Sequence, residues 1–170
     1  MFKYGDDLKQ DSLVLQMFRI FDKLWRENGY DFKMNIYRTL STGTEIGFIE
    51  IVDAENNSKI HKDYAKGLVD AFDERTTAVF LEDKNKNKTD LAMAKENYLR
   101  SSAGYLVATY VMGIGDRHSG NVMVQKNGKF FHIDFGHILG NFKMKFGVKR
   151  GIPSHMQSAP LCFSLQNFYT

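Results

Sequence analysis

The stretch that decides the fold runs from residue 113 to residue 136 and reads GIGDRHSGNVMVQKNGKFFHIDFG. Within it, the short apolar runs VMV and FFHI flank Asn127-Gly128. An Asn-Gly pair between two apolar runs is the strongest short-range signal for a β-hairpin. A hairpin brings the outer ends of its two arms together, so Asn121 and Asp134 are predicted to be neighbours in space.

The residues at these outer ends have the chemistry of a magnesium-dependent phosphate site. Magnesium prefers oxygen ligands, usually one or two carboxylates together with substrate phosphates. Protein kinases use an Asp, an Asn five residues later and then Asp-Phe-Gly for phosphoryl transfer. Asp116 and Asn121 have this spacing, and Asp134-Phe135-Gly136 follows the hairpin. The pattern therefore predicts Asn121 and Asp134 as metal ligands, with Asp116 and His118 facing the acceptor hydroxyl.

A simpler interpretation of the same residues exists. Asp and Asn side chains commonly hydrogen-bond to nearby backbone in turns, so Asp116 and Asn121 could be ordinary turn residues. We prefer the catalytic interpretation because the loop, the hairpin and Asp-Phe-Gly occur together in this order. The two histidines that flank Asp134, His132 and His137, are expected to have structural roles.

The composition is that of an ordinary globular protein. The chain has 170 residues, 43% of them apolar and 25% charged, with 14 Phe and 8 Tyr to fill a core. A single cysteine, Cys162, excludes an internal disulfide framework and a cysteine-based zinc site. Neither a signal peptide nor an apolar stretch of the roughly 20 residues needed to span a membrane is visible. We therefore expect a cytoplasmic protein, and no nucleic-acid partner.

Hydrophobic periodicity predicts the remaining elements, and together they give an α+β fold. Asp6 and Asp7 are suited to the start of the first helix and Gly29 to its end, and Thr89 is expected to cap the last helix, which should end at Gly113. The predicted helices are 9–28, 64–72, 76–81 and 89–112, the predicted strands are 33–40 and 45–52, and the predicted loops are 53–58 and 82–88.

Several motifs resemble those of the phosphoinositide 3-/4-kinase superfamily. Residues 113–121 and 131–137 are similar to its catalytic and metal-binding motifs. The order Asp-Arg-His, reversed relative to the His-Arg-Asp of ordinary protein kinases, is typical of that superfamily. FKYGDDLKQD, residues 2–11, resembles its segment at the ATP-binding lysine. The resemblance extends from Phe2 to about Arg150.

This resemblance implies a protein-kinase-like fold of two lobes. Residues 1–52 would be a partial N-lobe, with a helix, antiparallel strands and a hinge. Residues 53–150 would be a mostly helical C-lobe with the catalytic and activation loops. Residues 151–170 do not resemble the family after Pro153, and we expect them to be a divergent, disordered tail.

The resemblance also implies ATP and Mg²⁺ as cofactors. Lys3 corresponds to the lysine that contacts the ATP phosphates, and Asp11 and Tyr37 to a pair that helps to seat them. Glu50 and Val52 correspond to the hinge positions whose backbone holds the adenine.

On the acceptor side, the resemblance assigns His118 as the base or transition-state stabiliser, with support from Asp116. Histidine titrates near neutral pH, which suits proton transfer.

Four cations follow Asp-Phe-Gly within eight residues: Lys143, Lys145, Lys149 and Arg150. Interleaved with apolar residues, they would attract anionic headgroups at a membrane surface, although a solvated basic loop is an alternative. The pattern closely resembles class I phosphoinositide 3-kinases, in which these clusters face the extra phosphates of the inositol ring. That implies phosphorylation of the 3-hydroxyl of phosphatidylinositol (4,5-bisphosphate), with peripheral recruitment to the plasma membrane. It also implies a regulatory subunit or small GTPase that binds outside this chain.

Two other interpretations remain open. One is a protein serine/threonine kinase of the same superfamily, which the basic cluster disfavours. The other is a catalytically inactive fragment, truncated at both ends, because the glycine/serine loop that covers the ATP phosphates in this superfamily would precede Lys3.

Overall fold

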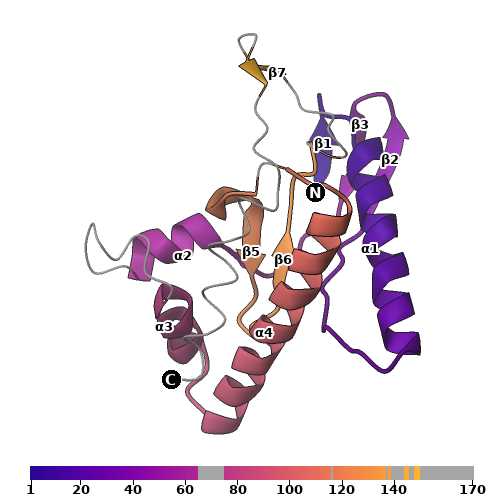
Figure 1. Cartoon of the computed structure of the whole chain (residues 1–170). Coiled ribbons are helices and arrows are strands. Elements are labelled where there is room, and N and C mark those ends of the chain that lie inside the picture. Colours follow the sequence, from indigo (N-terminus) through magenta and orange to yellow (C-terminus); the bar gives the residue numbers. More distant parts are fainter. Residues whose placement is uncertain (65–74, 116, 137, 139–143, 146–147, 150–170) are drawn as a thin grey trace.

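The computed structural model describes residues 1–64, 75–115, 117–136, 138, 144–145 and 148–149 (Figure 1). The helices are α1 (Lys9–Glu27), α2 (Asn57–Tyr64), α3 (Arg75–Lys84) and α4 (Lys88–Val111), with a 3-10 turn, η2, at Ser119–Asn121. The strands are β1 (Phe2–Tyr4), β2 (Thr39–Gly43), β3 (Ile46–Ile49), β4 (Glu55–Asn56), β5 (Val122–Val124), β6 (Phe130–His132), β7 (Met144–Lys145) and β8 (Val148–Lys149). Helices combined with antiparallel sheets confirm the α+β class.

The strands form three small antiparallel sheets with the orders β1-β3-β2, β4-β5-β6 and β7-β8. The predicted hairpin is confirmed: Val122 pairs with His132, and Val124 with Phe130. Just beyond the ladder, Ile133 N donates a hydrogen bond of 3.0 Å to Asn121 O. This bond ties the two outer ends of the hairpin together.

Aromatic rings from α1, α4 and the hairpin form the core. Tyr105 of α4 is fully buried, and its ring contacts Phe18 of α1 at 5.1 Å and Phe130 of β6 at 6.1 Å between centroids. Its hydroxyl donates a 2.6 Å hydrogen bond to Asn35 O, which satisfies the polar end of a buried ring. Phe18 also packs against Phe135, so the core reaches the Asp-Phe-Gly motif directly.

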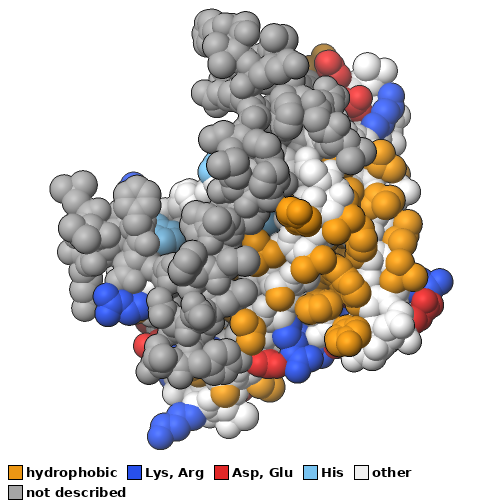
Figure 2. Space-filling view, viewed as in Figure 1, with side chains coloured by type: hydrophobic (Ala, Val, Ile, Leu, Met, Phe, Trp, Pro, Cys, Tyr) orange, Lys and Arg blue, Asp and Glu red, His pale blue; other side chains and the backbone are white. Residues whose placement is uncertain are grey.

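Not every apolar residue of the long helices is buried. Figure 2 shows hydrophobic side chains gathered over α1 and α4 on one face of the molecule. Leu13, Ile20 and Leu24 lie along α1, and each is about half exposed. Helix α1 therefore carries an apolar stripe on its outer side in addition to the buried stripe that contains Phe18.

The C-terminal end predicted for the first helix is confirmed, because Gly29 follows α1 with φ +83°. The predicted cap at Asp6 or Asp7 was wrong: Leu8 is the N-cap residue and makes no side-chain cap hydrogen bond, although Asp7 Oδ1 accepts a 3.0 Å hydrogen bond from Lys9 N. Helix α4 is followed by Gly113, also with positive φ. The predicted cap at Thr89 was wrong: Asn87 caps α4, because its side chain accepts a hydrogen bond from Thr89 N.

The strand predicted at 33–40 was wrong over most of its length, since β2 begins only at Thr39. The preceding segment is irregular because side chains of other elements bind its backbone. Arg19 donates to Tyr37 O at 3.0 Å, and Tyr105 donates to Asn35 O. The second predicted strand, 45–52, is shorter than expected and forms β3.

The loop predicted at 53–58 was also wrong, because it contains β4 and the start of α2. Asn56 Oδ1 accepts a 2.9 Å hydrogen bond from Ser58 N, which supports the first turn of α2. The helix expected at 76–81 is longer than expected and forms α3, so the loop expected at 82–88 is shorter. The helix expected at 64–72 and the tail at 151–170 lie outside the described residues, apart from Tyr64.

The turn of the hairpin allows a stability test of Gly128. This residue has φ +85°, and a Cβ atom there would collide with the carbonyl oxygen of Ala94 in α4. We expect Gly128→Ala to lower the free energy of unfolding by about 2–5 kcal/mol, the sum of left-handed strain and overpacking. Urea denaturation measures this loss.

Gly29→Ala is the matched control, because Gly29 has φ +83° but nothing within 4 Å of an added Cβ. It should lose only about 1–2 kcal/mol, the cost of the left-handed backbone. Equal losses in the two variants would show that the hairpin does not pack against α4 as described.

Candidate active site

One cavity of about 310 Å³ brings together most of the residues that the sequence singled out. It lies where the β1-β3 sheet faces the β5-β6 hairpin. Its polar lining residues include Lys3, Asp11, Tyr37, Glu50, Asn121 and Asp134, and its apolar lining residues are Met1, Ile49, Val52, Met123, Phe131 and Ile133. A concave, partly apolar space with a few converging polar groups is typical of a small-molecule site.

The two predicted metal ligands line this cavity together. Asn121 is largely buried at the end of η2, and Asp134 is exposed immediately beyond β6. An amide oxygen and a carboxylate fit the oxygen preference of magnesium. Among the described residues, no group of three or more His, Cys, Asp or Glu side chains could hold a metal. A magnesium ion here would therefore need further ligands from water or phosphate oxygens.

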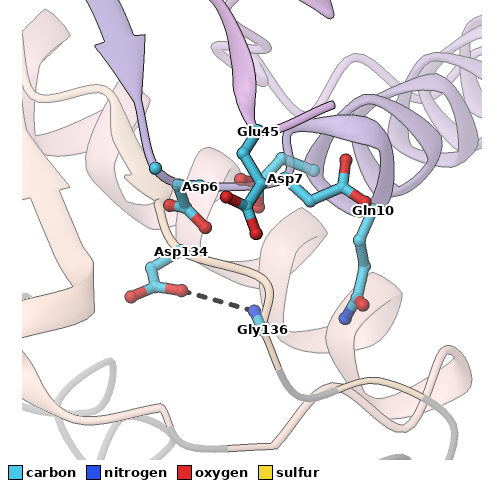
Figure 3. Close-up of a pocket in the computed structure, with 8 residues that line it drawn as sticks. Asp6, Asp7, Gln10, Glu45, Asp134 and Gly136 are labelled. Carbon is cyan, nitrogen blue, oxygen red and sulfur yellow. Dashed lines mark hydrogen bonds between the residues drawn. The ribbon is translucent and has the colours of Figure 1, made fainter. Parts of the chain in front are cut away.

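Asp134 has an unusual backbone conformation, with φ +58°. A non-glycine residue in this region is strained, by roughly 1–3 kcal/mol, and persists only where its surroundings hold it. Its carboxylate accepts a 3.3 Å hydrogen bond from Gly136 N, the dashed line in Figure 3.

Arg117 holds the backbone around this strained residue. Its Nη1 donates to Ile133 O at 2.8 Å, its Nη2 donates to Asp134 O, and its Nε donates to Gly115 O at 2.9 Å. The guanidinium is buried and lies 5.4 Å from the ring centroid of Phe135. One side chain thus connects Gly115 to the Asp-Phe-Gly motif.

Asp11, on the first turn of α1, also reaches this motif. Its Oδ1 accepts a 3.0 Å hydrogen bond from Phe135 N. Burial raises the pKa of the Asp11 carboxyl, and the nearby Asp134 adds to the shift, whereas the Phe135 N–H and the Lys3 ammonium oppose it. The carboxylate of Asp11 is therefore held in the site at an electrostatic cost, which a bound cation would relieve.

Lys3 lies at the rim of the cavity and forms an ion pair with Asp6 at 2.5 Å. This hydrogen bond is the main reason that the pKa of the Lys3 ammonium is raised. Burial opposes the shift, and the carboxylates of Asp11 and Asp134 add to it. Lys3 is thus a charged group placed among acidic residues, where a phosphate would compete with Asp6 for it.

A second, acidic pocket of about 270 Å³ adjoins the first (Figure 3). The two pockets share Asp11 and Asp134, and the second is also lined by Asp6, Asp7 and Glu45. Five carboxylates therefore surround the space next to Lys3. Because like charges repel, this region favours bound cations.

Tyr37 and the two predicted hinge residues, Glu50 and Val52, also line the first cavity. Tyr37 is buried with its ring against Phe131, and burial, then Asp11, raises the pKa of its hydroxyl, which stays protonated. Glu50 N donates to Arg38 O at 2.9 Å, and Glu50 Oε2 accepts from Arg38 N at 2.8 Å. Glu50 and Val52 directly follow β3 and both line the cavity.

The structure does not bring His118 into the lining of either pocket. His118 is exposed, and its Nδ1 accepts a 3.0 Å hydrogen bond from Gly120 N, so it caps η2. The sequence analysis did not predict this local hydrogen bond of His118. Asp116 lies outside the described residues.

Of the basic cluster, Lys143 and Arg150 lie outside the described residues. Lys145 and Lys149 belong to β7 and β8, which pair antiparallel through Lys145 with Val148 and Met144 with Lys149. The sequence analysis did not predict these two strands. His137 also lies outside the described residues.

His132 occupies the core beneath the site. It is fully buried against Tyr105 and Phe130, with its Nδ1 3.4 Å from Asn121 O. Burial, then the nearby Arg117, lowers the pKa of its ring to about 3. A neutral ring packed in this way fits the structural role expected of His132.

Sequence analysis missed two residues that hold the backbone around Asp134, Arg117 and Gln10. Gln10 Nε2 donates a 2.6 Å hydrogen bond to Phe135 O. Arg117 lies between the predicted catalytic residues Asp116 and His118, and this position could have indicated that it supports the site. Nothing in the sequence separates Gln10 from an exposed glutamine of the same helix such as Gln16.

Comparison with known proteins identifies similar sequences over almost the whole chain. The family model described as phosphatidylinositol 3- and 4-kinase matches residues 1–167. The match continues beyond Arg150, where the sequence resemblance was expected to end.

Three relatives are named as 3-kinases. Phosphatidylinositol 3-kinase 1 of Dictyostelium discoideum is 48% identical over 165 residues, 96% of this chain and 10% of that protein. The human phosphatidylinositol 3-kinase C2 domain-containing subunit gamma is 40% identical over 170 residues, 99% of this chain and 11% of that protein. Phosphatidylinositol 4-phosphate 3-kinase C2 domain-containing subunit alpha of Pongo abelii is 44% identical over 151 residues, 88% of this chain and 9% of that protein. The chain spans about a tenth of the length of these curated relatives.

The clamp formed by Arg117 can be tested through stability. We expect Arg117→Lys to lower the free energy of unfolding by about 2 kcal/mol, because an ammonium cannot reproduce the planar fork that binds several carbonyls. Arg38→Lys, which changes an exposed side chain, should stay within about 0.5 kcal/mol of the wild type. Denaturant unfolding of the three proteins measures both values. If Arg117→Lys proved as stable as the Arg38→Lys control, the clamp would be contradicted.

Proposed function

The chain belongs to the phosphatidylinositol 3- and 4-kinase family, and we propose that it is the nucleotide-binding and metal-binding part of a phosphatidylinositol 3-kinase catalytic domain. The reaction would transfer the γ-phosphate of ATP to the 3-hydroxyl of a phosphoinositide. The observation that supports this most is the single cavity lined by Lys3, Asp11, Tyr37, Asn121 and Asp134.

In this proposal the two ends of the cavity hold different parts of ATP. The adenine would lie against the apolar lining beside Glu50 and Val52, with hydrogen bonds from the hinge backbone. Lys3 would exchange its partner Asp6 for a phosphate. Asn121 and Asp134 would hold magnesium, which when bound neutralises charge on the triphosphate.

His118 would act on the acceptor side, with Asp116 in support. Its Nδ1 accepts the Gly120 N–H, so the neutral ring carries its proton on Nε2. In this tautomer Nε2–H donates a hydrogen bond and cannot accept a proton. The geometry therefore favours His118 as a donor that stabilises charge in the transition state, over His118 as the general base.

The substrate would be a phosphoinositide at a membrane surface. Lys143, Lys145, Lys149 and Arg150 would bind the phosphates of the inositol ring. Phosphatidylinositol 4,5-bisphosphate is the substrate expected from the class I pattern, and the relative named as a phosphatidylinositol 4-phosphate 3-kinase makes the monophosphate a second candidate.

Contact with the membrane would be peripheral in this proposal. Within the described residues, none of the helices has the length and apolar character that crossing a bilayer requires. A cytoplasmic enzyme would be recruited to the plasma membrane by a regulatory subunit or small GTPase that binds elsewhere on a longer protein.

The metal-binding assignment can be tested with Asp134→Ala. We expect the affinity for a fluorescent ATP analogue to fall at least about tenfold in the presence of Mg²⁺, since one of two protein ligands is lost. Affinity in EDTA should not fall, and phosphorylation of phosphoinositide vesicles, where the chain supports it, should disappear. Asp63→Ala removes an exposed carboxylate of α2 and should leave binding unchanged. Equal Mg²⁺ dependence of nucleotide affinity in the two variants would contradict the assignment. If the unmodified chain transferred phosphate to a peptide but not to lipid, that result would favour the protein-kinase alternative.

The headgroup assignment can be tested by replacing Lys143, Lys145, Lys149 and Arg150 with Ala in the intact protein. Each cation near an anionic surface contributes about 1 kcal/mol, so we expect activity on phosphatidylinositol 4,5-bisphosphate to fall at least about tenfold. Activity on phosphatidylinositol should fall much less.

The charge-matched control replaces four exposed lysines elsewhere: Lys23, Lys62, Lys86 and Lys88. It should reduce both activities equally and weakly, through the loss of general attraction to the membrane. Parallel losses on the two lipids in the loop variant would exclude recognition of the ring phosphates by these side chains. Activity of the unmodified protein on phosphatidylinositol 4-phosphate, measured beside the other two lipids, tests whether the monophosphate is the preferred substrate.

A further inference from the structure

We propose that Gln10 is a positioning residue for the metal ligand Asp134, which it controls through the backbone carbonyl of Phe135. This inference rests on the proposed function, because it gives Gln10 a part in magnesium binding. Gln10 itself does not line the cavity of Lys3 and Asn121 but the neighbouring acidic pocket.

Helix α1 binds Phe135 at three points. Gln10 Nε2 donates to Phe135 O at 2.6 Å, and Phe135 N donates to Asp11 Oδ1 at 3.0 Å. The Phe135 ring is fully buried and packs edge-on against Phe18 at 5.4 Å. Asp11 and Phe18 are seven residues apart, so they lie two turns apart on one face of α1. Both polar backbone groups and the side chain of Phe135 are therefore held by the same helix.

The residue before Phe135 is the one that needs this support. Asp134 has φ +58°, a conformation that a non-glycine residue keeps only when its neighbours are fixed. Arg117 fixes the preceding side through Ile133 O and Asp134 O. Gln10 and Asp11 fix the following side, so the strained residue is held from both directions. Figure 3 shows Gln10 on α1 with Asp134 and Gly136 on the opposing segment.

Gln10 is the member of this arrangement whose role can be isolated. Asp11 lines both pockets and carries a charge, so its replacement would change the electrostatics of the cavity as well as the hydrogen bond. Gln10 is neutral, and it reaches the metal-binding segment through its hydrogen bond to the Phe135 carbonyl. An effect of Gln10 on metal binding would therefore be transmitted through the conformation of that segment.

The test uses the whole chain with Gln10→Met and Gln10→Leu. Both variants remove the donor and stay neutral, so neither adds a charge to the acidic pocket that Gln10 lines. Gln16→Met is the control, because Gln16 is an exposed glutamine of the same helix. For each protein, the affinity for a fluorescent ATP analogue is measured with Mg²⁺ and with EDTA, and amide hydrogen exchange is followed over residues 132–136.

We expect both Gln10 variants to lose about tenfold of the Mg²⁺ enhancement of nucleotide affinity, a typical effect of removing a group that orients a metal ligand. Affinity in EDTA should stay at the wild-type value, and amide exchange over residues 132–136 should become faster. Gln16→Met should match the wild type in all three measurements. Together these results would separate positioning from a general loss of stability.

Three outcomes would overturn the inference. Faster exchange with an unchanged Mg²⁺ enhancement would show that the hydrogen bond is only structural. Wild-type enhancement in Gln10→Leu would show that the donor is not needed. A wild-type chain whose nucleotide binding does not depend on Mg²⁺ would instead contradict the proposed function, and the inference would fall with it.

Discussion

The structure depends on one strained backbone position, Asp134, and on the contacts that keep it there. A left-handed aspartate is stable only because the residues on both sides of it are fixed. Arg117 fixes one side from the catalytic loop, and the first turn of α1 fixes the other through Phe135. This requirement explains why a charged arginine is buried under the site, and why α1 packs its aromatic face onto the Asp-Phe-Gly motif. Two segments more than a hundred residues apart in sequence are thereby joined at the proposed metal site.

Electrostatics explains why these contacts alone do not complete the site. Five carboxylates line the acidic pocket, and Lys3, which lines the adjoining cavity, is already paired with Asp6. Burial next to Asp134 raises the pKa of Asp11, which means that its charged form is disfavoured there. A magnesium ion carrying a triphosphate would change this balance in two ways, by bringing positive charge to the carboxylates and a new partner to Lys3. The arrangement is therefore better suited to a metal–nucleotide complex than to either ion alone.

The sequence predicted the parts of this site that depend on short-range rules. Asn127-Gly128 between apolar runs predicted the hairpin, and the hairpin placed Asn121 beside Asp134. The irregular segment before β2 was predicted wrongly as a strand, because its backbone partners are Arg19 and Tyr105, which are distant side chains. Gln10 was missed for the same reason: its partner is 125 residues away, and no local pattern marks it.

Residues 118–121 show how much one short motif can specify when each residue has a separate contact. A Cβ atom on Gly120 would lie 2.9 Å from the His118 ring, so glycine is what allows this ring to fold over η2 and cap it. Gly120 O accepts a 2.7 Å hydrogen bond from Asn56, and Ser119 Oγ is 2.9 Å from Ser58 Oγ, so the turn is anchored to β4 and α2. The anchored turn ends at Asn121. The hydrogen bond from Gly120 N to His118 Nδ1 sets the tautomer of His118 and supports the turn that ends at Asn121. The acceptor side and the metal side of the proposed site are therefore coupled through the backbone of Gly120.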